Sequence, residues 1–292
     1  MPLLLDKTFS PFNSKRSSKG LTMSFFRIAV LALLVPLASF AAPVTVKGSD
    51  TMVILVQRWA EDFMKKNPGM QIQVTGGGSG TGLSALINGT TDIASSSRVI
   101  KEAEQDKLRS RFNTPGNEIA IAKDGVAFYV NDKNPIQSLT MEQLKQIYLG
   151  DITNWKEVGG PDAKIVVYSR ENSSGTYVFV KDHLLSGEDF VASAQTLPGT
   201  AAVVNAVAKE KFGIGYGGAA YGKGIRELKV KVGSDEVAPS LENVKSGKYP
   251  LSRDLYFYLR SKPGGEAKGF IDYCLSEPGQ KIVSQVGYFP IR

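Results

Sequence analysis

Four short polar stretches of the chain combine Ser, Thr and Gly at points where an expected strand gives way to an expected helix. They are residues 48–51, 76–82, 95–98 and 170–176. The first turn of a helix has unpaired backbone N–H groups at the positive end of the helix dipole, so it attracts anions. Gly lets an anion approach the backbone, Ser and Thr add hydroxyl donors, and Arg adds a planar pair of N–H donors. Together the stretches predict one site for a small oxyanion, with phosphate favoured.

Each stretch taken alone is explained equally well as an ordinary helix cap. Asp50 or Thr51, for example, is expected to cap the helix that follows. Arg170 is harder to explain in this way, because it ends an expected buried strand, where a guanidinium needs an acid or a bound anion. Arg98 leaves two interpretations open: a role in the site, or solvation among charged neighbours such as Glu104.

The sequence gives little support for catalysis or metal binding. A serine hydrolase needs a base beside its nucleophile, and the one histidine, His183, shares an expected helix face with Val180 and Leu184. The chain has no G-x-S-x-G motif, and its glycine loop 76–82 does not have the dinucleotide-binding spacing G-x-G-x-x-G at any register. No His/Cys cluster has zinc spacing, and no Asp-rich loop has calcium-binding spacing. A binding protein without cofactor or metal is therefore favoured over an enzyme. A secreted phosphate-ester hydrolase with Ser79 or Ser174 as nucleophile is the alternative.

Residues 1–41 have the pattern of a secretory signal peptide. Arg27 precedes an uncharged apolar run at residues 28–37, and small residues precede a cleavage site after Ala41. Met23 lies four residues before Arg27 and makes a better-proportioned start than Met1. The apolar run is shorter than the roughly 20 residues that a membrane-spanning helix needs. We therefore expect a cleaved protein that is released into the periplasm.

Composition limits the remaining function classes. Cleavage after Ala41 would remove five basic residues and one acidic residue, leaving 30 basic against 27 acidic residues. The net charge of +7 of the whole chain is thus partly contributed by the leader and is weak evidence for nucleic-acid binding. The single Cys274 lies in an apolar run and is expected to be a buried thiol. About 250 mature residues are enough for two ordinary domains.

Alternating strands and helices must position the polar stretches. Strands are expected at 44–46, 71–74, 92–94, 126–130, 165–168, 213–216 and 255–259. Helices are expected after residue 51 and at 83–87, 141–149, 177–185, 201–208 and 269–284. This order predicts a mainly parallel α/β sheet, in which ligands gather at the carboxyl ends of strands. The strands 126–130 and 255–259 are the natural places for the chain to leave one lobe and return to it.

Taken together, the motifs resemble the PstS family, the periplasmic phosphate-binding proteins of high-affinity phosphate ABC transporters. The resemblance is carried by G-S-D-T at 48–51, G-G-G-S-G at 76–80, D-I-A-S-S-S-R at 92–98 and S-R-x-x-S-S-G-T at 169–176. It runs from Val44 to about Pro290 with the motifs in the same order and spacing. It implies the type II periplasmic-binding-protein fold, in which two Rossmann-like α/β lobes are joined by two crossover strands and the ligand lies in the interlobe cleft.

The resemblance also implies domain limits and partners. Lobe I is expected to comprise residues 42–125 plus 255–292, and lobe II residues 126–254. The protein is expected to be a monomer that closes over inorganic phosphate by a hinge motion, delivers it to ABC permease subunits, and binds no nucleic acid. A receptor of the same fold for sulfate or molybdate is a further alternative.

The family's phosphate contacts can be carried onto individual positions of this chain. They fall on Thr51, Met52, Ser79, Ser97, Arg170, Ser174, Gly175 and Thr176, with Ser49, Asp50 and Arg98 as additional candidates. Ser97 is a departure, since well-known members have there an Asp that accepts the proton of hydrogen phosphate and repels sulfate. Asp50 and Glu171 are the nearest candidates to replace that carboxylate.

Overall fold

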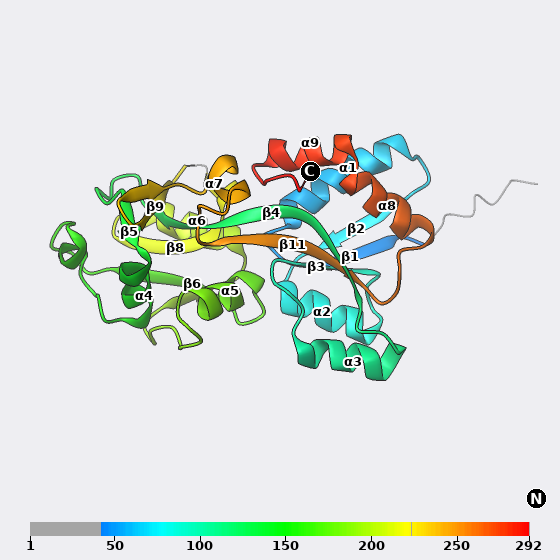
Figure 1. The fold of residues 1–292 in the computed structure, drawn as a ribbon, viewed down its shortest axis with the longest axis horizontal. Helices are drawn as coiled ribbons and strands as arrows, with labels where there is room; N and C mark the ends of the chain where they lie inside the picture. Colours follow the sequence, from blue (N-terminus) through cyan, green and yellow to red (C-terminus); the bar gives the residue numbers. More distant parts are fainter. Residues whose placement is uncertain (1–41, 223, 292) are drawn as a thin grey trace, which may run out of the picture. The chain divides into compact units, whose positions relative to one another are not determined.

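The computed structural model describes residues 42–222 and 224–291 (Figure 1). The predicted signal peptide at residues 1–41, with the alternative start at Met23, lies outside the described residues. The described residues belong to one compact unit, Phe40–Arg292.

The N-terminal part alternates parallel strands with helices. Its elements are β1 (Val44–Gly48), α1 (Val53–Lys66), β2 (Ile72–Thr75), α2 (Ser79–Asn88), β3 (Ile93–Ser96) and α3 (Glu102–Phe112). Strand β1 lies between β2 and β3 and is parallel to both. Helix α1 buries Leu55, Trp59 and Phe63, as their i, i+4, i+8 spacing predicts. The carboxyl ends of β1 and β3 therefore lie next to each other, and each delivers one of the polar stretches.

The middle part of the chain repeats this arrangement. Its elements are β5 (Ser138–Thr140), α4 (Met141–Leu149), η1 (Trp155–Val158), β6 (Val166–Arg170), α5 (Gly175–His183), β7 (Gln195–Leu197), α6 (Thr200–Lys209), β8 (Gly213–Gly218), η2 (Ala219–Tyr221), β9 (Arg226–Val232), β10 (Asp235–Val237) and α7 (Leu241–Lys245). Strand β6 is parallel to both β7 and β8. As predicted, β6 ends at Arg170, which leads directly into the turn before α5.

Two strands, β4 (Asn117–Val130) and β11 (Ser252–Leu259), connect these parts. They pair antiparallel from Gly125 opposite Ser252 to Asn117 opposite Leu259 and run side by side between the two ends of the molecule (Figure 1). The sheet order is β2-β1-β3-β11-β4-β8-β6-β7. The sheet is thus mixed, not mainly parallel as predicted. Strand β4 also begins earlier than the predicted 126–130, because its first half pairs with β11.

The predicted single helix at 269–284 is wrong. The chain forms α8 (Gly265–Leu275) and α9 (Glu277–Val286), which meet at Ser276. Ser276 has extended backbone angles, and its hydroxyl caps α9. Pro278 lies in the first turn of α9, where its missing N–H has no intrahelical partner to lose.

Each part of the molecule has its own hydrophobic cluster. The cluster of the N-terminal part also draws on β11, α8 and α9, and its largest members include Trp59, Phe63, Phe257 and Phe270. The cluster of the middle part includes Phe128, Tyr148, Trp155 and Tyr216. Cys274 is fully buried in the first cluster, and burial raises the pKa of its thiol, which confirms the predicted buried thiol.

Candidate anion-binding site

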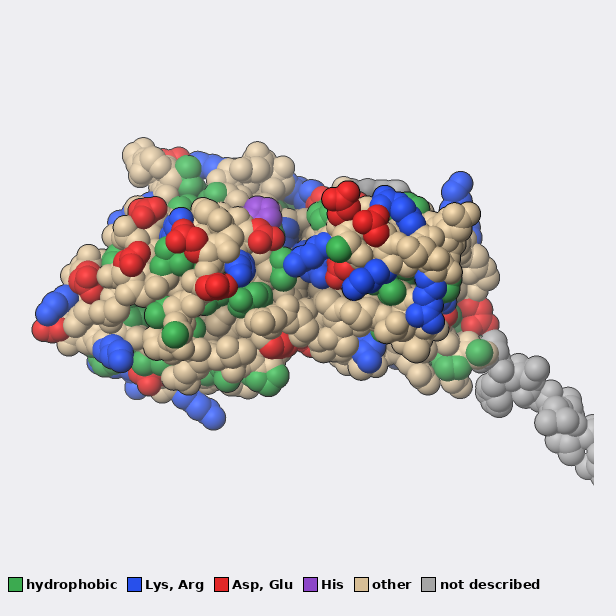
Figure 2. Space-filling view, turned by 90° about the horizontal axis from the view of Figure 1, so that it is seen from below, with side chains coloured by type: hydrophobic (Ala, Val, Ile, Leu, Met, Phe, Trp, Pro, Cys, Tyr) green, Lys and Arg blue, Asp and Glu red, His purple; other side chains and the backbone are tan. Residues whose placement is uncertain are grey.

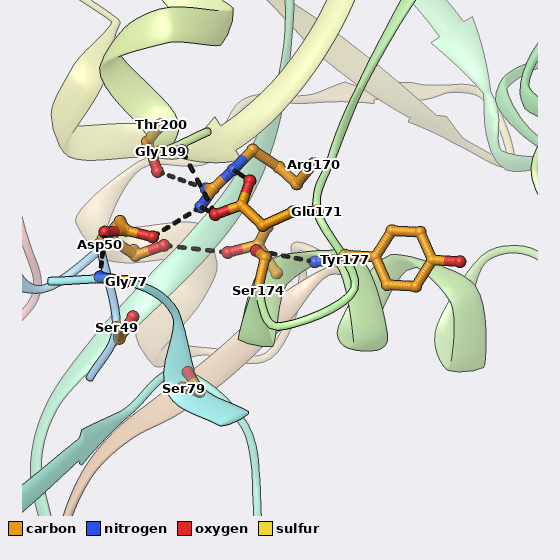
Figure 3. A network of polar contacts seen from close by, with 12 residues as sticks. Ser49, Asp50, Gly77, Ser79, Arg170, Glu171, Ser174, Tyr177, Gly199 and Thr200 are labelled. Carbon is orange, nitrogen blue, oxygen red and sulfur yellow. Dashed lines mark hydrogen bonds and ion pairs between the residues drawn. The ribbon is translucent and has the colours of Figure 1, made fainter. Parts of the chain in front are cut away.

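Ser49, Ser79 and Ser97 come from three of the polar stretches and lie against one another. The Ser49 hydroxyl donates to Ser97 Oγ at 3.0 Å, and Ser79 Oγ lies 3.4 Å from Ser97 Oγ. The Ser97 backbone N–H donates to Ser79 Oγ at 3.0 Å. All three side chains are buried. The fold therefore gathers hydroxyl groups from the ends of β1 and β3 and from the first turn of α2 at one point. Ser49 and Ser79 of this group are labelled in Figure 3.

The fourth stretch, at the start of α5, closes over this group from the middle part of the chain. Thr176 Oγ1 lies 2.9 Å from Thr51 Oγ1, and the Gly80 N–H donates to the Ser173 carbonyl at 2.9 Å. A Cβ atom on Gly175 would lie 2.6 Å from Ser97 Oγ and closer still to Ser79 Oγ. Only a residue without a side chain fits here, so the two parts of the molecule meet at van der Waals contact around the hydroxyl groups.

The first turns of α1 and α2 have no side-chain cap. Their N-cap residues are Met52 and Gly78, and neither makes a side-chain capping bond. The prediction that Asp50 or Thr51 caps α1 is therefore wrong: Thr51 faces Thr176 instead. The side chains of Asp50 and Thr51 therefore do not serve as helix caps, and capping does not explain why these residue types stand before α1.

Two other predicted phosphate contacts, Ser174 and Met52, form hydrogen bonds with residues close to them in the sequence. The Ser174 hydroxyl caps α5 by accepting the Tyr177 N–H at 3.2 Å (Figure 3). The Met52 N–H donates to the Ser49 carbonyl at 3.0 Å. A hydroxyl both accepts and donates, so Ser174 still has a hydrogen for a second partner.

Arg170 spans the two parts of the molecule. Its guanidinium donates from Nη2 to Asp50 Oδ2 and from Nη1 to Thr200 Oγ1, each at 2.9 Å, and Nη2 lies 3.4 Å from Glu171 Oε1 (Figure 3). The Arg170 side chain is only 1% exposed. The expectation that this buried guanidinium needs an acid is met by two carboxylates, and Asp50 comes from the opposite side of the site.

Arg98 is arranged differently, and the interpretation of a solvated side chain is wrong. Its two terminal nitrogens each donate to Glu104, both at 2.8 Å, and Nη1 also donates to the Val99 carbonyl. Burial alone would raise the pKa of Glu104, but the hydrogen bonds and positive charges of Arg98 and Lys101 together outweigh it and lower that pKa. Arg98 is thus paired within its own loop and the following helix.

Sequence reasoning missed a second buried ion pair, formed by Arg253 of β11 and Asp124 of β4. Arg253 donates to Asp124 Oδ2 from Nε at 3.0 Å and from Nη2 at 2.7 Å. The same guanidinium reaches the Ser97 carbonyl and Thr176 Oγ1. The burial of Arg253 could have been predicted from the sequence. In a strand, residues two apart point to the same face, and Arg253 is two residues before the buried Leu255.

The charges around the site nearly balance. Arg170 and Arg253 stand against Asp50, Glu171 and Asp124. The attraction for an anion must then come mainly from hydroxyl groups, backbone N–H groups and the starts of helices. Figure 2 shows both acidic and basic side chains on one face of the molecule, with several basic side chains close together on its right half.

His183 does not join the serines. Its ring stacks on Phe179 with centroids 4.1 Å apart, and Nδ1 lies 3.0 Å from the Phe179 carbonyl oxygen. Across residues 42–222 and 224–291, no hydrogen bond links His183 to Ser79 or Ser174. The nucleophile and base of the hydrolase alternative are therefore not paired in this structure.

Metal-binding clusters and membrane-spanning helices are both absent from residues 42–222 and 224–291. Within them, no group of three or more His, Cys, Asp or Glu side chains is placed to hold a metal ion. None of the helices in this part of the chain has the length and apolar character needed to cross a membrane.

Comparisons with known proteins agree with this geometry. Residues 36–278 match the PBP superfamily domain. The chain is 33% identical over 264 residues to the phosphate-binding protein PstS of Pseudomonas aeruginosa, covering 84% of this chain and 81% of the relative. It is 36% identical over 249 residues to PstS of Bacillus subtilis, covering 85% and 80%.

Solved structures show the same fold. A putative phosphate ABC transporter substrate-binding protein from Clostridium perfringens, solved with bound phosphate, superposes with a TM-score of 0.79 at 32% identity, covering 86% of this chain and all of that one. An ABC-type phosphate transport receptor from Vibrio cholerae superposes with a TM-score of 0.68 at 30% identity, covering 84% and 99%. The predicted fold class, two α/β lobes joined by crossover strands, is confirmed. The chain belongs to the PstS family of phosphate-binding proteins.

Proposed function

We propose that this chain is an extracytoplasmic solute-binding protein that captures inorganic phosphate and delivers it to the permease subunits of an ABC transporter for high-affinity uptake. The relatives in Pseudomonas aeruginosa and Bacillus subtilis are named as phosphate-binding proteins. The similar structure from Clostridium perfringens contains bound phosphate. These relatives are binding proteins, so we propose that the chain binds its ligand without covalent chemistry.

The proposed lobes follow the two hydrophobic clusters. Lobe I comprises residues 42–125 plus 255–292, and lobe II comprises residues 126–254. The sheet order supports this division. Strands β4 and β11 lie in its middle, and the chain passes from one proposed lobe to the other only along these two strands. Phosphate would lie between the lobes and be released when β4 and β11 flex.

One observation carries the proposal: hydroxyl groups from both lobes converge where α1, α2 and α5 begin. Thr51 faces Thr176 across the lobes, and Ser49, Ser79 and Ser97 meet beside Gly175. The residues that we propose to contact phosphate are Thr51, Met52, Ser79, Ser97, Arg170, Ser174, Gly175 and Thr176, with Ser49, Asp50 and Arg98 as additional candidates.

Selectivity among oxyanions then depends on whether a group in the site accepts a hydrogen bond from the proton of hydrogen phosphate. Asp50 accepts from Arg170 through Oδ2 and from the Gly77 N–H at 2.7 Å through Oδ1, so both of its oxygens are engaged. Glu171 also faces Arg170. Ser97 can accept the proton of hydrogen phosphate, but its hydroxyl can turn and donate to a fully deprotonated anion. We therefore propose weaker discrimination against sulfate than in family members that have Asp at this position.

We also propose that the chain acts in the periplasm as a monomer after cleavage following Ala41. The mass of the exported protein and sequencing of its N-terminus test this directly. A mature chain that begins at Ala42 supports the proposal, and a chain that retains residues 1–41 contradicts it.

Phosphate-dependent thermal stability tests the ligand. Above Kd, each tenfold increase in phosphate should stabilise the folded protein by about 1.4 kcal/mol, because the ligand binds only the folded state. Protein freed of carried-over ligand that shows no shift in Tm at millimolar phosphate would contradict the proposal. Competition with sulfate and molybdate ranks the other oxyanions, and a phosphatase assay on the parent and on His183→Ala tests the hydrolase alternative.

A further inference from the structure

Arg253 lies at the point where the crossover strands meet the proposed anion site. In the pairing of β11 with β4, Arg253 stands opposite Asp124. The Arg253 side chain is 4% exposed and that of Asp124 is fully buried. Nε and Nη2 of Arg253 both donate to Asp124 Oδ2. This pairing neutralises the guanidinium and fixes its orientation.

The remaining donors of Arg253 reach one residue from each proposed lobe. Nη1 donates to the Ser97 carbonyl at 3.0 Å, and Nη2 donates to Thr176 Oγ1 at 3.0 Å. Ser97 follows β3 in lobe I, and Thr176 lies in the first turn of α5 in lobe II. Both contacts exist together only while the lobes are as close as in this structure.

The direction of these hydrogen bonds constrains the Thr176 hydroxyl. A guanidinium has donors but no acceptor, so Thr176 Oγ1 must accept from Arg253. The hydroxyl hydrogen of Thr176 then points elsewhere, and its neighbour is Thr51 Oγ1 at 2.9 Å. A pair of hydroxyl groups oriented in this way has a free hydrogen to offer to an anion.

We propose that Arg253 is a positioning residue of the anion site: it orients the Thr176 hydroxyl as a donor and ties Thr176 and Ser97 together in the closed form. The proposal rests on the proposed function, since it assumes that an oxyanion binds between the lobes. Asp124 serves to hold Arg253 and to balance its charge. The site then includes a charged pair from the crossover strands β4 and β11. The sequence motifs, by contrast, place all of its residues in loops and helix starts.

The neighbouring pair on the same strands provides a matched control. Lys123 and Asp254 also stand opposite each other in the β4–β11 register, and Lys123 Nζ lies 2.6 Å from Asp254 Oδ1. Their side chains are 38% and 34% exposed. This pair has the same strands and the same charge types, but neither of its side chains forms a hydrogen bond with Ser97 or Thr176.

The central variant replaces both members of the buried pair, Arg253→Met with Asp124→Leu. Replacing a buried ion pair by apolar side chains of similar volume usually keeps the fold, whereas removing one partner leaves a buried charge. We expect this double variant to lose about tenfold or more in phosphate affinity, mainly through faster dissociation, because a hydrogen bond from a charged donor is lost. The control Lys123→Met with Asp254→Leu should bind phosphate like the parent.

A double-mutant cycle with Thr176→Val shows whether Arg253 acts through Thr176. If it does, adding Thr176→Val to the Arg253/Asp124 variant should cost much less affinity than adding it to the parent. A merely structural role of Arg253 would instead give additive losses. Arg253→Lys keeps the charge but not the planar fork, and it should show the intermediate loss expected when one of the two contacts is kept.

The outcomes separate this inference from the proposed function. A parent protein that does not bind phosphate overturns the proposed function before any variant is measured. A parent that binds phosphate while the folded Arg253/Asp124 variant binds within about twofold of it overturns the inference alone, since a charged hydrogen bond should contribute more. Additive losses in the Thr176 cycle overturn it as well. Coupled losses with an unaffected Lys123/Asp254 control support it.

Discussion

Arg170 and Asp50 form an ion pair with 2.9 Å between Nη2 and Oδ2, although 120 residues separate them in the sequence. Arg170 ends a strand of the middle part of the chain, and Asp50 follows a strand of the N-terminal part. The pair therefore joins the two proposed lobes at the edge of the site. Opening of the cleft would separate Arg170 from Asp50, while Glu171 beside it would remain as a partner.

The first prediction concerns Arg170→Ala. A charge-assisted contact in a desolvated cleft contributes more than a neutral hydroxyl, so we expect phosphate affinity to fall by at least ~2 kcal/mol. Removal of the guanidinium also leaves the carboxylates of Asp50 and Glu171 without their positive partner, so they would repel the bound anion. Titration calorimetry with phosphate measures it. Arg98→Ala is the comparison, because Arg98 is paired with Glu104. If Arg170→Ala bound phosphate like the parent and Arg98→Ala did not, Arg98 and not Arg170 would be the arginine that contacts phosphate.

The second prediction concerns Gly175→Ala. The new Cβ would lie 2.6 Å from Ser97 Oγ and against Ser79, so the closed arrangement of the lobes could not form without displacement of both hydroxyls. We expect phosphate affinity to fall by about tenfold to a hundredfold, with the fold retained, because overpacking typically costs about 1–3 kcal/mol. Gly69→Ala is the control, since a Cβ there meets nothing within 4 Å. Equal affinities of the two variants would show that the lobes close differently around the ligand.

The third prediction concerns Ser97→Asp. A carboxylate at this position would share the proton of hydrogen phosphate but would repel sulfate, which has none near neutral pH. We expect sulfate binding to fall more than phosphate binding in this variant. Competition titrations of parent and variant with both anions between about pH 6 and 8 measure the ratio. A parent that already excludes sulfate, and a variant that changes nothing, would mean that another carboxylate accepts the proton; Asp50 is the first to examine.

The fourth prediction concerns stability and pH. Burial, helped by the negative charge of Asp124, raises the pKa of Glu227 to about 7, and Glu227 Oε1 has no hydrogen-bond partner. The folded protein thus holds this proton more tightly than the unfolded chain, whose Glu has a pKa of about 4.3. Between these values unfolding releases the proton, so the contribution to stability is present at low pH and is lost as the pH rises towards 7.

Glu227→Gln should remove that dependence. The variant should gain in Tm relative to the parent as the pH rises from about 5 to about 8. Glu236→Gln is the control: hydrogen bonds from Ser138 and Lys229 lower the pKa of Glu236, so it stays ionised over the whole range. Parallel Tm curves for the parent and Glu227→Gln would contradict the raised pKa.

Local sequence patterns predict which hydroxyl groups lie together wherever a strand end, a Gly and a hydroxyl follow one another. Ser49, Ser79, Ser97 and Thr176 were all found in this way, and the structure brings them together. The family resemblance supplied the two-lobed architecture. These features are encoded within a few consecutive residues, so they can be read without knowledge of tertiary contacts.

Features that depend on distant pairing could not be predicted. Asp124 and Arg253 are 129 residues apart, and only the register of β4 with β11 makes them neighbours. The early start of β4 has the same origin. The split of the predicted helix 269–284 was open to prediction, because Pro278 marks the first turn of a new helix.

The packing of Trp59 has a consequence for the order in which the chain can fold. Its indole N–H donates to the Gly279 carbonyl at 2.7 Å, and its ring packs edge-on against Phe257. The N-terminal cluster is thus completed only by residues from the last part of the chain. The cluster of the middle part is built from residues within 126–251 and needs only Phe289 from the C-terminal end. During synthesis the segment 44–112 is made before the partners of its core. This part of the core can therefore close only after the C-terminal helices have been added.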